Sequence, residues 1–211
     1  MHAANFLESV YWLGGSPCAG KSTIATLLGE QLGWRVYHCD DFYGDHKQRA
    51  TPVDQPVFYA LARLSGDALW LRPVTEQIVT EINFCADEFS LVLEDLAQIA
   101  AEDERPLLFE GTAVLPHLLQ PRLASTQHAF YLLPSQAFQM HYYAQRPWIH
   151  DILATTSDPE QAFANWMERD ASFARWVERQ ATQYGMAWLA VDGTLTIAET
   201  AARVAHHFGV G

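Results

Sequence analysis

Two kinds of pattern alternate along the chain: short runs of apolar, β-forming residues and longer stretches with apolar residues at helical spacing. The short runs predict five strands, at residues 10–13, 35–39, 107–109, 128–133 and 187–191. After the first run, Ile24, Leu27, Leu28 and Leu32 lie on one helical face, and Gly33 is placed to end that helix. Strands that alternate with helices indicate an α/β fold with a mostly parallel, five-stranded sheet covered by helices on both faces.

The helical pattern is longest in two places. Residues 56–101 carry apolar positions on both sides of an acidic stretch at 87–88, which predicts a helical insertion between strands two and three. Residues 159–184 predict a long amphipathic helix whose aromatic residues mostly belong to the core. Residues 44–56 are polar and interrupted by Gly and Pro, so we expect a loop over an active-site mouth, and we expect residues 147–159 to be flexible. Shorter helices are expected at residues 116–119, 136–145 and 197–208.

Composition narrows the possible partners. A chain of 211 residues with 49% hydrophobic and 18% charged residues is typical of one globular domain. The 25 acidic residues outnumber the 13 basic ones, and a net charge of −12 opposes nonspecific binding to nucleic acid or to an anionic membrane. We expect a small-molecule substrate, no nucleic acid, no membrane, and a monomer or homodimer.

The sequence also indicates in which cellular compartment the protein is expected. No apolar run reaches the roughly 20 residues that a membrane helix needs, and residues 1–9 lack the basic start and apolar core of a secretory signal. Three cysteines, Cys18, Cys39 and Cys85, favour a reducing compartment over a disulfide framework. We therefore expect a cytoplasmic protein.

A phosphate-binding pattern follows the first strand, a Gly, four residues, then Gly-Lys-Ser. Small residues let backbone N–H groups curl around a triphosphate, Lys21 reaches the β and γ phosphates, and the Ser22 hydroxyl can bind Mg²⁺. A helix that begins at the loop adds its partial positive charge. We predict binding of ATP and Mg²⁺ by Gly15, Ser16, Pro17, Cys18, Ala19, Gly20, Lys21, Ser22 and Thr23.

Acidic residues follow the next two predicted strands. Asp40 and Asp41 come directly after the second, and Glu110 ends the third. Because ligands bind at the carboxyl ends of parallel strands, these acids are expected to face the bound triphosphate. We predict that Asp40 is a catalytic base and magnesium-side carboxylate, and that Glu110 holds Mg²⁺ with Ser22. Alternatively, each acid only caps a turn or lies in a solvated loop.

A family resemblance rests on these residues. The segment from Gly14 to Thr23, then Asp40-Asp41-Phe42-Tyr43, then Glu110-Gly111 resembles the P-loop small-molecule kinases. The nearest patterns are those of the uridine kinase and nicotinamide riboside kinase group, and the loop is also similar to that of chloramphenicol phosphotransferase. The resemblance implies a three-layer P-loop NTPase fold, with the base at Asp40 and the magnesium-side acid at Glu110. It covers residues 10–45 and 106–112, and the insertion at 56–101 does not align.

Kinases of this layout also place arginines from a mobile lid on the transferring phosphoryl group. The corresponding region here is roughly residues 146–175, which makes Arg146 and Arg169 candidate catalytic residues. Residues 56–101 would cover the substrate within a single domain spanning 1–211. Candidate substrate residues are Asp41, Tyr43, Trp70 and Arg72, with a core position as the alternative for Trp70.

The function predicted is an ATP-dependent kinase that phosphorylates a hydroxyl group of a nucleoside, vitamin or antibiotic-like molecule. A nucleoside monophosphate kinase is an alternative, and it would need Arg49, Arg63 or Arg72 at its acceptor phosphate. A non-catalytic ATP-binding regulatory module is another. We do not expect zinc at His38, Cys39 and His46, because no second ligand pair lies at structural-site spacing.

Overall fold

Five strands form one sheet in which every adjacent pair is parallel, in the order β2-β3-β1-β4-β5. The computed structural model describes residues 6–210. The strands are β1 (Val10–Gly15), β2 (Arg35–His38), β3 (Leu107–Glu110), β4 (Ala129–Pro134) and β5 (Ala187–Val191). The predicted parallel five-stranded sheet is thus confirmed.

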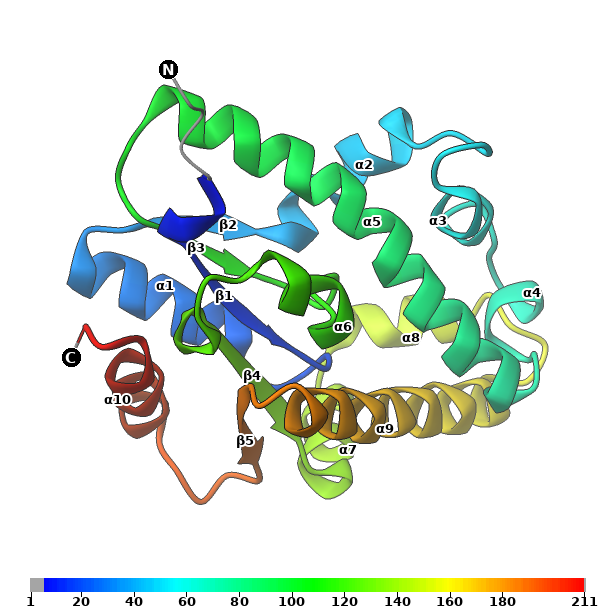
Figure 1. Cartoon of the computed structure of the whole chain (residues 1–211). Coiled ribbons are helices and arrows are strands. Elements are labelled where there is room, and N and C mark those ends of the chain that lie inside the picture. The colour runs from blue at the N-terminus through cyan, green and yellow to red at the C-terminus, as the bar shows by residue number, and fades with distance from the viewer. Residues whose placement is uncertain (1–5, 211) are drawn as a thin grey trace.

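Helices cover both faces of this sheet (Figure 1). The α-helices are α1 (Lys21–Leu32), α2 (Tyr43–Arg49), α3 (Pro56–Leu61), α4 (Asp67–Trp70), α5 (Val74–Glu102), α6 (Pro116–Leu119), α7 (Gln136–Tyr143), α8 (Pro147–Leu153), α9 (Pro159–Gln183) and α10 (Ile197–Phe208). Short 3₁₀ helices lie at η1 (Phe6–Ser9), η2 (Cys39–Phe42), η3 (Gln120–Arg122) and η4 (Thr126–His128).

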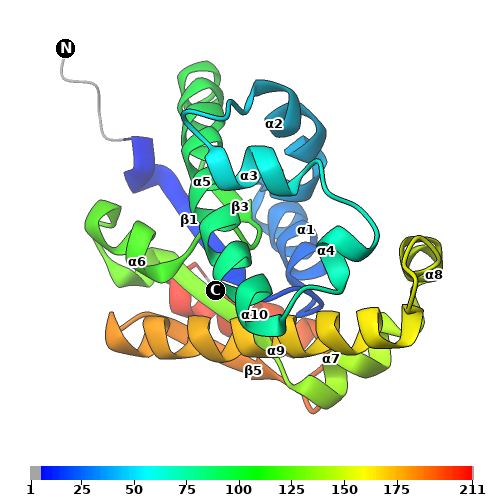
Figure 2. The ribbon, with the colours of Figure 1, turned by 90° about the vertical axis from the view of Figure 1, so that its right-hand side faces the viewer.

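Neighbouring residues of a strand point to opposite faces and build two separate cores. Leu13 of β1 and Leu108 of β3 pack in a cluster with α1 and α10. Trp12 and Phe109, one position away on the same strands, pack in a second cluster with α5 and α9. Figures 1 and 2 show α1 and α10 on one side of the sheet and α5 and α9 on the other. The near-continuous apolar runs of β1, β3 and β4 therefore reflect burial on both faces.

The strand order places the three predicted site segments side by side. β1, β3 and β2 are adjacent, and Glu110 pairs with Leu13 on one side and with His38 on the other. Since the strands are parallel, the segments that follow them all begin at the same side of the sheet, where the carboxyl ends of the strands lie. The phosphate-loop pattern follows β1, and Asp40 lies in η2 directly after β2.

Two segments, one expected to be a loop and the other to be flexible, contain helices. Residues 43–49 form α2, which has one buried side chain, His46, so the segment offers too few apolar positions to show a helical period. Residues 147–153 form α8, with Pro147 in its first turn, where a missing N–H costs nothing. Ile149 and Leu153 are the buried side chains of α8, four residues apart on one face. The prediction of a loop was therefore wrong for residues 44–49, and the flexibility of residues 147–159 stays a prediction.

The insertion between β2 and β3 is helical as predicted, but it is divided. It consists of α3, α4 and α5, with Gly66 at a positive φ of 55° immediately before α4. The acidic stretch at 87–88 lies within the continuous helix α5, where Glu88 is buried and bonded to His46 of α2. Between residues 6 and 210, no helix combines the length and the apolar character needed to cross a membrane.

Candidate functional site

The loop between β1 and α1 forms the centre of the candidate site. Gly15 has a φ of 134°, and a Cβ atom there would lie 1.9 Å from the Leu132 carbonyl oxygen, so only glycine fits beside β4. Gly20, with a φ of 75°, precedes the first residue of α1. The N-terminus of a twelve-residue helix therefore opens into the loop, where its free N–H groups and partial positive charge suit an anion.

Lys21, the first residue of α1, is buried beneath the loop. Its Nζ atom donates a hydrogen bond to the Ser16 carbonyl oxygen over 2.9 Å. The Ser16 hydroxyl in turn donates to the carbonyl oxygen of Asp170 on α9, over 3.2 Å. The loop is thus attached to both α1 and α9, and the ammonium group is held in place before any ligand binds.

The two carboxylates beside Lys21 are in different electrostatic environments. Asp40 is open to solvent on its cavity side, but protein atoms crowd the rest of the side chain. This partial desolvation, opposed by Lys21 and reinforced by Glu110, raises the pKa of Asp40 above its ordinary value. Burial would raise the pKa of Glu110 too, but a hydrogen bond from His38, the charge of Lys21 and a hydrogen bond from Ser22 outweigh it and lower that pKa.

His38 is a member of the site that sequence reasoning did not assign to it. Its Nδ1 atom lies 3.0 Å from Oε2 of Glu110, and its Nε2 atom lies 3.3 Å from the Thr26 hydroxyl on α1. The bond to Glu110 is the main cause that raises the pKa of His38. The only available signal was its place at the end of the second predicted strand, two residues before Asp40.

Two cavities meet at these side chains. One, of about 460 Å³, is lined by the phosphate loop, Asp40 and Glu110, and is bounded on the far side by Tyr143, Arg146 and Trp148. The other, of about 660 Å³, is lined by Ser22, Asp40, Asp41, Glu110 and His38. Both volumes fall in the range of small-molecule sites.

A third cavity, of about 530 Å³, adjoins the other side of the loop. Phe138 and Tyr142 of α7 form one wall, and Val191 and Ile197 belong to the wall on the side of β5 and α10. Arg146 lines both this cavity and the one containing Asp40. The site therefore combines anion-binding backbone, oxygen donors and an aromatic recess in one continuous region.

The two candidate catalytic arginines have different surroundings. Arg146 is half-buried at the start of α8, where its guanidinium group lies 3.6 Å from the Cys18 sulfur atom and 4.9 Å from the centre of the Tyr143 ring. Arg169 is buried in α9 and forms ion pairs with Asp170 at 2.6 Å and Glu81 at 3.4 Å. Only Arg146 lines the cavities that surround the loop.

The candidate substrate residues are dispersed. Asp41 lines the cavity beside Ser22, and Tyr43 is partly exposed against Phe58 and Phe84 of the insertion. Trp70 is buried, with its ring stacked 4.0 Å from the ring of Trp166 and with Arg169 also over it. Arg72 donates to the hydroxyl of Thr80. The contacts of Trp70 are those of the core alternative, because a second indole occupies the face that a flat substrate would need.

Comparisons with known proteins give a fold and a partial relative. No protein-family model matches the sequence. An adenylate kinase from Thermus thermophilus is 34% identical over 110 residues, a match covering 51% of this chain and 55% of that protein. The adenylate kinase of a second strain of the same organism matches to the same extent. The chain thus spans about half the length of the curated relatives it matches.

Among solved structures, shikimate kinase from Acinetobacter baumannii in complex with shikimate matches with a TM-score of 0.50 and 16% identity. The match covers 94% of this chain and 92% of that one. The chain has a P-loop kinase fold. Deoxyadenosine kinase from M. mycoides with bound dATP matches with a TM-score of 0.47 and 12% identity, over 95% of this chain and 99% of that one. The finer resemblance to uridine and nicotinamide riboside kinases stays a prediction.

Proposed function

We propose that this protein is an ATP-dependent kinase that transfers the γ-phosphoryl group to a hydroxyl of a small molecule. The observation that carries the proposal is the pair of carboxylates beside Lys21, whose pKa values are shifted in opposite directions. When the pKa values of two acids in one site are shifted apart in this way, the two acids suit different roles. The acid with the raised pKa, Asp40, suits proton transfer, and Glu110 remains ionised.

The binding of a nucleotide is supported by the phosphate loop and by the cavity next to it. Backbone N–H groups at the start of α1 and the ammonium group of Lys21 would hold the phosphates. The recess between α7 and the segment after β5, with Phe138 and Tyr142 on its wall, would take the base. The partial relatives, both adenylate kinases, are likewise enzymes named for a nucleotide.

The oxygen donors fit a magnesium ion. Mg²⁺ prefers hard oxygen ligands and is held by one or two carboxylates together with substrate phosphates. Ser22, Asp40 and Glu110 line the same two cavities. The ion would offset the negative charge of the transferring phosphoryl group. We assign it chiefly to Ser22 and Glu110, because the low pKa of Glu110 keeps that carboxylate charged.

The chain's own residues then divide the reaction between them. Asp40 accepts the proton of the acceptor hydroxyl as the acceptor oxygen bonds to the γ phosphorus and the bond to the ADP oxygen breaks. Lys21 stabilises the charge on the phosphates, and Arg146 adds a guanidinium group from the opposite wall of the cavity. The insertion α3–α5 would cover the acceptor and the region of α8 would act as the lid, within one domain.

The arginines favour a hydroxyl acceptor over a phosphate acceptor. A nucleoside monophosphate kinase needs basic side chains free to bind the acceptor phosphate. Arg49 instead donates to Asp45 and Glu94, at 2.7 and 2.8 Å. Arg63 donates to backbone carbonyl oxygens of α2 and α3, and Arg72 to a threonine hydroxyl on α5. None of these three lines the cavities around the phosphate loop.

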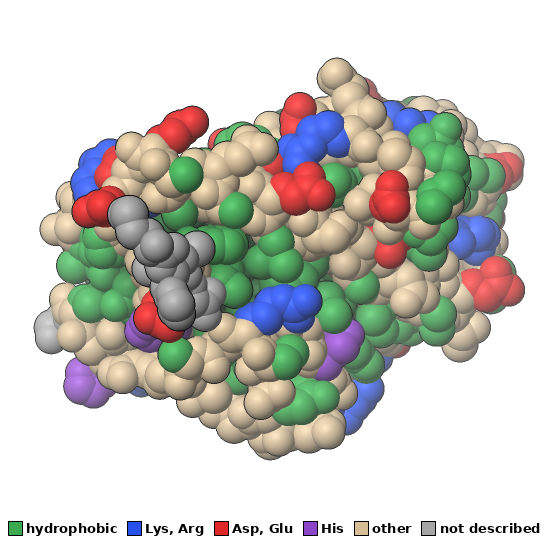
Figure 3. Space-filling model, turned by 45° about the horizontal axis from the view of Figure 1, so that its top comes forward, with side chains coloured by type: hydrophobic (Ala, Val, Ile, Leu, Met, Phe, Trp, Pro, Cys, Tyr) green, Lys and Arg blue, Asp and Glu red, His purple; other side chains and the backbone are tan. Residues whose placement is uncertain are grey.

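A monophosphate acceptor remains the second candidate, because the partial relatives are adenylate kinases. On the face shown in Figure 3, basic side chains are scattered among acidic and apolar ones. This distribution accords with a small-molecule acceptor rather than nucleic acid. A regulatory module that binds ATP without an acceptor is the remaining alternative.

The test is an ATP-consumption screen across nucleosides, nucleoside monophosphates, vitamins, sugars and antibiotics, with the product identified by mass spectrometry. We expect a phosphorylated alcohol whose formation needs Mg²⁺ and is lost in Lys21→Ala. A product phosphorylated on an existing phosphate would replace the proposal with the monophosphate kinase. ATP binding with no acceptor in any class, together with ATP-dependent partner binding, would favour the regulatory module.

A further inference from the structure

Three buried side chains of different metal-binding chemistry meet where η2 and α2 pack on α5. They are the Cys39 thiol, the His46 imidazole and the Glu88 carboxylate, with exposed fractions of 2%, 0% and 5%. One donor atom from each lies within 4.8 Å of the other two. None of the three lines the cavities around the phosphate loop. This cluster is therefore separate from the proposed kinase chemistry.

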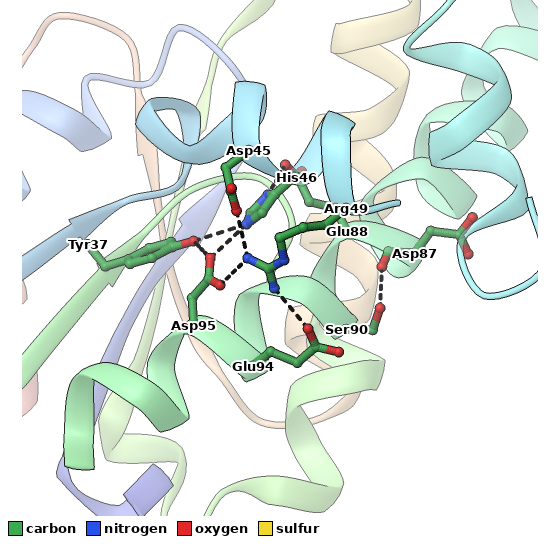
Figure 4. A network of polar contacts seen from close by, with 9 residues as sticks. All are labelled: Tyr37, Asp45, His46, Arg49, Asp87, Glu88, Ser90, Glu94 and Asp95. Atoms are coloured by element: carbon green, nitrogen blue, oxygen red, sulfur yellow. Dashed lines mark hydrogen bonds and ion pairs between the residues drawn. The ribbon is translucent and has the colours of Figure 1, made fainter. Parts of the chain in front are cut away.

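A second carboxylate fixes which nitrogen of His46 faces the cluster. Oδ2 of Asp95 lies 2.9 Å from Nε2 of His46 and accepts a hydrogen bond from the Tyr37 hydroxyl at 2.6 Å (Figure 4). An ionised Asp95 cannot donate, so Nε2 carries the proton. Nδ1, on the other side of the ring, lies 3.0 Å from Oε1 of Glu88. A carboxylate on the far nitrogen of a histidine is the usual support of a metal-bound imidazole.

The charges permit an exchange of protons for a cation. When the Cys39 thiol and Nδ1 of His46 each carry a proton beside the ionised Glu88 carboxylate, the cluster has no net charge. If both protons leave, a thiolate, a neutral imidazole and a carboxylate remain, and a divalent cation restores the original total charge. Arg49 already pairs with Asp95, so that second carboxylate needs no further counter-ion. The exchange therefore leaves no uncompensated charge in the core.

We propose that Cys39, His46 and Glu88 bind a divalent transition-metal ion, and the donor set favours Zn²⁺. Thiolate, imidazole and carboxylate are the three protein ligands of zinc, whereas magnesium and calcium sites lack sulfur. Nitrogen and oxygen ligands about 2.0 Å from a tetrahedral ion lie about 3.3 Å apart. The His46–Glu88 separation of 3.0 Å is close to that value, so binding needs a small opening of this pair and an approach of the sulfur atom.

The sequence concealed this site because its third ligand is remote. Cys39 and His46 are seven residues apart, but Glu88 comes from the middle of α5, 42 residues beyond His46. The ion would join η2 and α2 to α5, and η2 also carries Asp40. It would thus hold in place the turn that presents the proposed base.

The experiment is a Co²⁺ titration of the full chain, stripped of metal by a chelator and kept reduced, without nucleotide. Co²⁺ bound through Cys39 gives an intense thiolate-to-cobalt charge-transfer absorption, and the oxygen ligands of the proposed magnesium site give none. We expect one equivalent of Co²⁺ to saturate the band and Zn²⁺ to displace it. Absence of the band in the wild-type protein overturns the proposal.

Variants assign the ligands. Cys39→Ser should lose the band, while Cys85→Ser, another buried thiol, and Cys18→Ser in the phosphate loop should retain it. A band that survives in Cys39→Ser, or disappears in Cys18→Ser, overturns the assignment. Asp95→Asn should weaken metal affinity about 10–100-fold, as expected for a residue that orients a ligand. If Cys39→Ser does not fold, the affinities of Glu88→Gln and Asp95→Asn decide, and wild-type affinity in both contradicts the site.

Discussion

A hydrogen bond of 3.0 Å joins Nδ1 of His38, the last residue of β2, to Oε2 of Glu110, the last residue of β3. The two residues are direct partners in the parallel register. The other imidazole nitrogen bonds to Thr26 of α1, so His38 connects the proposed magnesium-side acid to the helix that begins at the phosphate loop. His38 is therefore a positioning residue for Glu110.

His38→Ala should raise the Mg²⁺ concentration that nucleotide binding needs, without abolishing that binding. Without His38, Glu110 loses the hydrogen bond that orients it, and loss of such a support typically costs about 10–100-fold in metal affinity. The measurement is the Mg²⁺ concentration that half-saturates binding of a fluorescent ATP analogue. Thr26→Val, which removes only the bond at Nε2, should give a smaller shift. An unchanged Mg²⁺ midpoint in His38→Ala would argue against Glu110 as a metal ligand.

Arg146→Ala should reduce phosphoryl transfer at least about 10²-fold, as expected when a donor to the transferring group is removed. Arg146 is half-buried and makes no ion pair among the described residues, so stability should change by no more than about 1 kcal/mol. The matched control is Arg175→Ala, which removes an exposed arginine paired with Glu168. Equal turnover in the two variants would rule out a catalytic role for Arg146.

Arg169→Met should destabilise the fold and affect catalysis only through that loss. It leaves the carboxylates of Asp170 and Glu81 without their cation in a buried setting, which typically costs about 3–5 kcal/mol. Denaturant unfolding measures the loss, and activity per folded molecule separates it from chemistry. A variant with wild-type stability and no turnover would instead support a catalytic role for Arg169.

Asp40→Asn should raise the thermal unfolding midpoint at pH 7. The pKa of Asp40 is raised in the folded state. The protonated side chain therefore contributes its full stabilisation below the pKa of an unfolded Asp, about 4. This stabilisation is lost as the pH rises through the pKa of the folded state. The asparagine does not ionise and avoids this loss. Unfolding midpoints of both proteins across pH should converge in acid and separate toward neutrality. A midpoint that falls at pH 7 contradicts the direction given for this pKa.

Much of the fold was predictable from local pattern. The central strands β1, β3 and β4 are almost wholly buried, so each is an apolar run, whereas the edge strands β2 and β5 are only partly buried. The helix at 197–208 was predicted with its observed bounds. α2 was missed because its buried residue is His46, whose partners Glu88 and Asp95 lie on a distant helix. A polar residue that is buried through long-range pairing looks like a surface residue in the sequence.

The site was predictable where chain order determines position. The loop, Asp40 and Glu110 follow three predicted strands, and the sheet order puts those strands side by side. The different surroundings of Arg146 and Arg169 were not predictable, because Arg169 is buried against Glu81, which comes from the insertion. Local spacing contains no information about that contact.

The central claim is that Asp40 is the base of a phosphoryl transfer to a hydroxyl. Its most direct test compares ATP affinity and transfer rate in Asp40→Asn with those of the wild-type protein, using the acceptor found by the screen. We predict that the transfer rate falls by about 10²–10⁴-fold, the usual contribution of a general base. The dissociation constant for ATP should stay within a few-fold, since the phosphates are held by the loop and Lys21. A variant that binds ATP and transfers the phosphoryl group at the wild-type rate would contradict the account.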